Sequence, residues 1–131
     1  MRFTEHELTV ALTGVARSVL AVQDKQVRKG RRTEEEMWES LGRYERFVVL
    51  DGLGSQLLPV LVALPDVEVR TGERATYTDE QITAAVEERL GDERGARRTA
   101  LRTARVALVK LALECLPPRQ DPDTLTVPDH L

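Results

Sequence analysis

Three copies of one short motif, a threonine followed three residues later by glutamate or glutamine, constrain the fold of this chain more than any other feature. The pairs are Thr4 with Glu7, Thr33 with Glu36, and Thr78 with Gln81. Each pair has the pattern of a capping box, in which the two side chains accept hydrogen bonds from backbone N–H groups that the first helical turn leaves without partners. The motif therefore predicts three helix starts and favours a helical fold.

The spacing of apolar residues extends these starts into helices. Between residues 5 and 22 apolar side chains recur every three or four positions, a stripe typical of core packing and also of a subunit interface. Gly52 and Gly54 are expected to end a second helix, and Pro117 and Pro118 to end the last one. The predicted helices are 5–22, 34–51, 56–64, 79–90 and 93–116.

The run from 57 to 64 is apolar on nearly every side. A helix of this kind is either buried at the centre of a protein or forms half of an interface. A buried strand is the alternative for so short a run. The candidate interface residues are Leu57, Leu58, Val60, Leu61 and Leu64.

Residues 67–77 do not have helical spacing. Polar and apolar side chains alternate there on either side of Thr71 and Gly72. This pattern favours a small β-hairpin. We therefore expect an all-α chain in the main: a single helical domain over 1–116, built as a compact bundle of about five helices with the hairpin attached. An extended C-terminal tail over 117–131 completes the expectation.

Composition excludes several classes of protein. A chain of 131 residues is long enough for one core. Cys115 is the only cysteine, so a disulfide scaffold and a cysteine zinc cluster are excluded, and a cytoplasmic location is expected. Polar residues and Pro59 interrupt the apolar stretch 47–64, and no signal-peptide pattern precedes it, so we expect no membrane span.

The net charge of −3 conceals two basic segments. One precedes the second capping box and the other lies on the last predicted helix, where four arginines share one side. The residues are Arg28, Lys29, Arg31 and Arg32, and Arg94, Arg98, Arg102 and Arg105. They are candidates for binding nucleic acid or another anion, in an arrangement loosely like a helix-turn-helix. The alternative is a solvated surface whose arginines pair with neighbouring carboxylates.

Residues able to carry catalysis are few. His6 is predicted on the exposed side of the first helix, and His130 lies one residue from the chain end. Cys115 lies near the C-terminus of the last predicted helix, where the dipole opposes a thiolate, and is predicted to be a buried structural residue. The glycines at 52 and 54 lack the third glycine and the lysine of nucleotide-binding loops. We therefore predict no catalytic residue, cofactor or metal site.

These observations lead to two hypotheses, with an enzyme whose site is assembled by oligomerisation as a further alternative. The first is a non-catalytic cytoplasmic interaction or regulatory protein that binds itself as a homodimer or binds another protein. The second is a nucleic-acid-binding regulator that uses the arginine-rich last helix. The second hypothesis gains weight if both basic segments share one face, and loses it if nearby carboxylates neutralise them.

Overall fold

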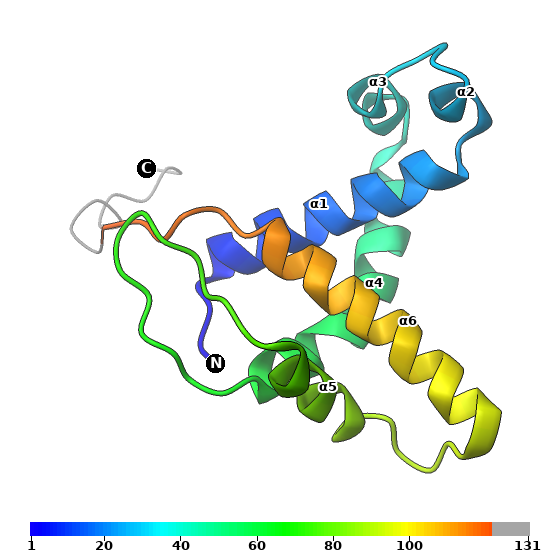
Figure 1. Cartoon of the computed structure of the whole chain (residues 1–131). Helices are drawn as coiled ribbons and strands as arrows, with labels where there is room; N and C mark the ends of the chain where they lie inside the picture. The colour runs from blue at the N-terminus through cyan, green and yellow to red at the C-terminus, as the bar shows by residue number, and fades with distance from the viewer. Residues whose placement is uncertain (122–131) are drawn as a thin grey trace.

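The structure, a computed structural model, describes residues 1–121 and is mainly helical, as predicted (Figure 1). Within that range there are six helices and no strand. In chain order they are α1 (Glu5–Gln23), α2 (Lys25–Arg28), α3 (Glu34–Glu39), α4 (Arg43–Ala63), α5 (Asp79–Glu87) and α6 (Gly95–Glu114).

All three predicted capping boxes are confirmed. Thr4, Thr33 and Thr78 each accept a hydrogen bond from the backbone N–H three residues on, and the side chain at that position accepts one in return. The short α2, which the sequence pattern did not predict, begins in a similar way, because the Asp24 carboxylate accepts from the N–H groups of Gln26 and Val27. Local side-chain chemistry thus determines where four of the helices begin.

The predicted break at Gly52 and Gly54 is wrong, and so is the division into helices 34–51 and 56–64. The chain breaks instead between Glu39 and Arg43, and α4 continues through both glycines and through Pro59. Glycine costs a helix about 1 kcal/mol relative to alanine. Burial of Leu57, Val60 and Leu61 on the same helix outweighs that cost, since each such side chain contributes roughly 1.5–3 kcal/mol.

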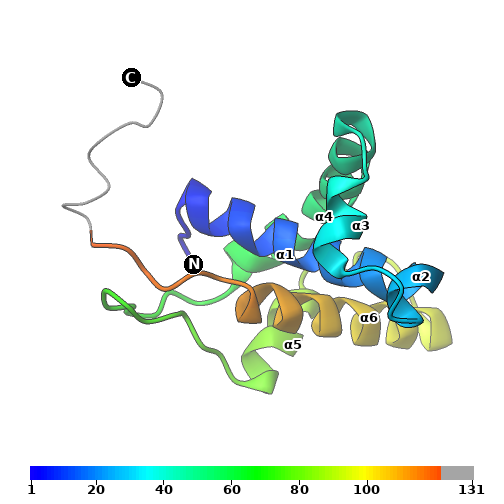
Figure 2. The same ribbon diagram turned by 90° about the horizontal axis from the view of Figure 1, so that it is seen from above.

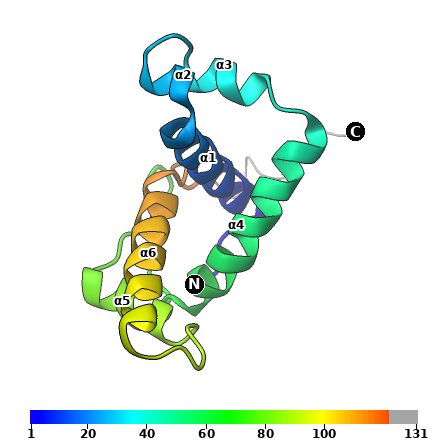
Figure 3. The same cartoon turned by 90° about the vertical axis from the view of Figure 1, so that its right-hand side faces the viewer.

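The core lies where α1, α4, α5 and α6 pack on one another. The side chains most completely withdrawn from solvent are Leu57, Leu61, Leu64, Val15, Val60, Val86 and Val109. The N-terminal half of α4 projects away from α6, and α2 and α3 stand at the end of α1 (Figures 2 and 3). This half of α4 is therefore less covered than the half that contributes to the core.

The predicted hairpin over 67–77 is not formed in the described structure. A turn does occur at the expected place, where Gly72 has a φ of +87° and the Glu73 N–H donates to the Arg70 carbonyl at 2.9 Å. However, the turn itself bonds to residue 119: Gly72 N–H donates to the Arg119 carbonyl at 2.8 Å, and Arg119 N–H donates to the Glu73 carbonyl at 2.7 Å. The Glu73 carbonyl, which in a hairpin would accept from the opposite arm, thus accepts from the C-terminal segment instead.

The start of the predicted tail is consequently attached to the helical part (Figure 1). The Arg119 guanidinium donates to both Glu7 carboxylate oxygens, at 2.9 and 3.1 Å. Arg74 Nε donates to the Leu116 carbonyl at 2.6 Å. The rest of the predicted tail, including His130, lies outside the described residues.

Candidate functional site

Two of the four candidate arginines on α6 are held by one carboxylate from α5. Glu87 accepts from Arg102 at 2.8 Å and from Arg98 at 2.9 Å. These two hydrogen bonds, first that from Arg102 and then that from Arg98, hold the pKa of Glu87 below its usual value. Both guanidinium groups thus already have an anionic partner.

Backbone carbonyls of the loop before this helix hold two of the candidate arginines, Arg98 and Arg105. Arg98 also donates to the carbonyls of Gly91 and Glu93, at 3.3 and 3.2 Å. Arg105 reaches the Arg89 carbonyl at 3.4 Å, and exposed Arg94 caps α6 without a side-chain hydrogen bond. The arginines of α6 therefore belong in large part to the packing of α5 and its loop against α6.

The second basic segment, on α2 and the loop after it, is less compensated. Arg32 pairs with Asp24, whose pKa is lowered chiefly by that hydrogen bond and also by the backbone N–H of Val27. In contrast, four exposed cations of this segment make no ion pair with any residue of 1–121. They are Lys25, Arg28, Lys29 and Arg31, called here the α2 cluster.

The two basic segments are not adjacent, although α2 and the beginning of α6 both lie on the side that faces the viewer in Figure 3. Figures 1 and 3 show α2 and the beginning of α6 at opposite ends of the molecule. The juxtaposition that would favour one continuous anion-binding surface is therefore not present in the described structure.

Four of the five candidate interface residues lie inside the chain. Leu57, Val60, Leu61 and Leu64 are buried in the core, so the prediction of an interface at these positions is corrected to intramolecular packing. Sequence alone left both alternatives open, and the contacts with α1, α5 and α6 decide between them. Leu58 is half-buried and lines a groove at the surface.

An exposed apolar surface lies about two and a half to three and a half turns before Leu57 on α4. Tyr44, Phe47 and Val48 are 76%, 60% and 48% exposed. Beside them is an open groove of about 510 Å³ between α4 and Leu12 of α1. Its α4 lining consists of Phe47, Leu50, Asp51, Gly54, Ser55, Leu58 and Pro59. We call the three exposed side chains and this groove together the α4 surface.

Sequence reasoning missed this surface because Trp38, Leu41, Tyr44 and Val48 follow the spacing of a single helix, and that spacing does not show which of them are exposed. The helix break at 40–42 separates them, so that Trp38 is buried and Tyr44 is not. In length and composition α4 also qualifies as a membrane span, and only 28% of its most apolar window is buried in the structure. Cores and interfaces produce the same composition, so the predicted absence of a span stays a prediction.

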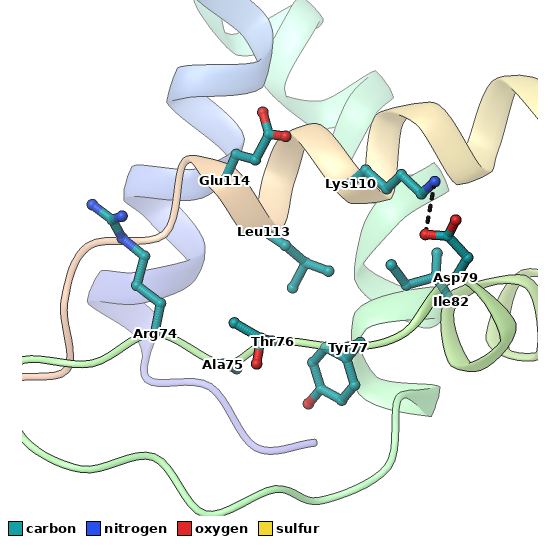
Figure 4. Close-up of a pocket in the computed structure, with 9 residues that line it drawn as sticks. All are labelled: Arg74, Ala75, Thr76, Tyr77, Asp79, Ile82, Lys110, Leu113 and Glu114. Atoms are coloured by element: carbon teal, nitrogen blue, oxygen red, sulfur yellow. Dashed lines mark ion pairs between the residues drawn. The ribbon is translucent and has the colours of Figure 1, made fainter.

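A second hollow, of about 250 Å³, lies between α5, α6 and the segment before α5 (Figure 4). Most of its charged groups already have partners within the chain. Lys110 pairs with Asp79 at 3.0 Å, and Arg74 Nε donates to the Leu116 carbonyl. The Tyr77 hydroxyl donates to the Pro65 carbonyl at 2.9 Å. Burial, assisted by Asp66, raises the pKa of Tyr77 to about 12, so this phenol is no proton acceptor near neutral pH.

The remaining residues with reactive side chains are separated. His6 is exposed on the first turn of α1. Cys115 is half-buried against Gly14, and burial, followed by the charges of Glu114 and Glu34, raises the pKa of its thiol. Among residues 1–121 no three histidine, cysteine or acidic side chains come together in a way that could hold a metal ion.

Comparison of this chain with protein-family models, with curated proteins and with solved structures finds no match.

Proposed function

We propose that this chain is a non-catalytic interaction protein that acts as a homodimer through the α4 surface. The observation that carries the proposal is the exposure of Tyr44 and Phe47 beside an apolar groove. An aromatic side chain has roughly 150–250 Å² of surface, and more than half of each of these two is exposed. A concentration of apolar surface of this kind is typical of an interaction site.

The charges around the α4 surface favour a second copy as the occupant. Arg43, Glu45 and Asp51 are exposed on the same stretch of α4 as the apolar residues, so that both signs of charge are present. A strongly charged partner gains little from such a surface, whereas another copy carries the same balance. In a two-fold dimer each copy contributes the same patch, which removes two apolar surfaces from water at once.

The test is the mass of the chain in solution, measured by light scattering over a range of concentrations. The wild type is expected to be a dimer, and Phe47→Glu a folded monomer, because Phe47 lies outside the core. Val22→Glu is the matched control, since Val22 is 70% exposed but lies at the end of α1. A wild type that is monomeric at all concentrations overturns the proposal. If this monomer also floats with lipid vesicles in a density gradient, the α4 surface binds a membrane instead of a second copy.

The α2 cluster supports a second candidate function, the binding of nucleic acid. Four exposed cations without an ion pair in 1–121 are the kind of group that neutralises phosphates. On this proposal, the protein is retained on immobilised duplex DNA at low salt, and its retention falls steeply as salt is added. The double variant Arg28→Ala/Arg31→Ala is expected to lose retention. Arg102→Ala is the control, because Arg102 is paired with Glu87. No retention at low salt contradicts it.

A further inference from the structure

Phe47 and Gly54 lie on the same side of α4. Phe47 projects from that side, whereas Gly54 leaves a hollow in it. They are seven residues apart, which brings them within about 20° of each other around the helix and separates them by about 10 Å along it. Phe47 is a large, exposed side chain, whereas Gly54 has none and lies at the base of the groove. One surface thus carries both a projection and a hollow.

The hollow at Gly54 has apolar walls. A methyl group built at this position would lie 3.7 Å from Leu58 Cδ1 and 3.9 Å from Leu12 Cδ1, ordinary van der Waals distances. Within one chain there is therefore room for a methyl group and no side chain that occupies it. A ring from another molecule would enter between α1 and α4 and contact these two leucines.

We propose that a second copy of this chain fills the groove with its Phe47, in an antiparallel pairing of the N-terminal halves of the two α4 helices. This inference rests on the proposed function, a homodimer through the α4 surface, and adds its geometry. A two-fold interface requires a surface complementary to itself, and a projection beside a hollow meets that requirement. In a parallel pair, Phe47 would face Phe47 and both hollows would stay empty, whereas in the antiparallel pair each ring enters a hollow.

The arrangement places the two-fold axis midway between residues 47 and 54, next to Asp51. The two copies of Asp51 are then close together across the axis, a like-charge contact that opposes the pairing and that the burial of the two Phe47 rings has to outweigh. The two copies of position 43 are about 22 Å apart along the helices, at a rise of 1.5 Å per residue. In a parallel pair, by contrast, the two copies of position 43 would also be close together, so the distance between them distinguishes the two arrangements.

Disulfide formation between copies tests this geometry, with Cys115→Ala removing the native thiol. Asp51→Cys is expected to form a covalent dimer on mild oxidation, and Arg43→Cys is expected to stay uncrosslinked, since both side chains are exposed. A dimer that crosslinks at 43, or at neither position, overturns the antiparallel pairing but keeps the proposed function. A chain that is monomeric at all concentrations overturns both.

Filling the hollow tests the contact itself. Gly54→Ala is expected to leave the free chain at least as stable, because alanine favours helix, while weakening the dimer about tenfold by obstructing the ring. Gly52→Ala is the matched control, since a methyl group there meets nothing within 4 Å and Gly52 is not part of the groove. An unchanged dissociation constant for Gly54→Ala overturns the insertion of Phe47.

Discussion

Gly14 shows how much a single residue decides in this protein. A Cβ at this position would lie 2.7 Å from the Sγ and 2.8 Å from the Cβ of Cys115. Real side chains do not approach so closely, so α1 and α6 pack in the observed way only because residue 14 has no side chain. Cys115, predicted as a structural residue, contacts this point directly.

Gly14→Ala is therefore expected to lower the free energy of unfolding by about 1–3 kcal/mol through overpacking. Urea denaturation measures the change. At Gly52 a Cβ would have no neighbouring atom within 4 Å. Gly52→Ala is therefore expected to raise the free energy of unfolding by about 0.5–1 kcal/mol. Replacing Cys115 by glycine in the Gly14→Ala chain should recover part of the loss, and an absence of any recovery would contradict the contact.

A second single residue, Glu7, makes the stability of the protein depend on pH. Burial by itself raises the pKa of this carboxyl, but the Arg119 guanidinium and the Thr4 N–H outweigh burial and hold it below the ordinary value of 4.5. A lowered pKa contributes stability that is complete above the unfolded value and is lost as the pH falls through the folded value.

The wild type is thus expected to lose stability relative to Glu7→Gln as the pH falls below about 4.5. Unfolding curves of both proteins between pH 3 and 7 provide the measurement. The comparison isolates Glu7, because Glu87 and Asp24, which also have lowered pKa values, are present in both proteins. A constant difference across this range would contradict the assignment.

At the scale of elements, the break between α3 and α4 is the feature that reorganises the fold. Trp38 ends up buried near the end of α3, and its carbonyl accepts from Arg46 at 2.8 and 3.2 Å. The same guanidinium lies 5.2 Å from the centre of the indole ring. Arg46 thus joins the two helices across the break and satisfies a carbonyl at the end of the first.

Arg46→Ala is expected to cost about 1–2 kcal/mol of stability and to expose the edge of Trp38. Because Trp38 is the only tryptophan, its fluorescence should shift to longer wavelength in this variant. Arg43→Ala, at an exposed position on the same helix, is the control and should leave the spectrum unchanged.

At the scale of the whole molecule, the C-terminal segment joins parts that are distant in sequence. Arg119 contacts Glu7 at the start of α1 and the turn at Gly72 and Glu73. The sequence pattern suggested a tail with little to bury, because the pattern carries no information about contacts over 112 residues.

Two truncations measure what this segment contributes. A chain that ends at 116 is expected to be less stable, by about 3 kcal/mol, than one that ends at 121, because Glu7 would lose its partner while buried. Thermal unfolding of the two shortened chains gives the difference directly, and equal midpoints would contradict it.

The sequence by itself determined the helical class of the described chain and the places where α1, α3 and α5 begin. Each capping box joins residues three positions apart, so its pattern can be recognised without knowing which distant residues meet. Only the tertiary structure decided that α4 continues through Gly52 and Gly54, that Leu57 is core while Phe47 is surface, and that Glu87 holds Arg98 and Arg102. These outcomes depend on which distant side chains meet, and burial and ion pairing between them outweigh the local preferences that a sequence pattern records.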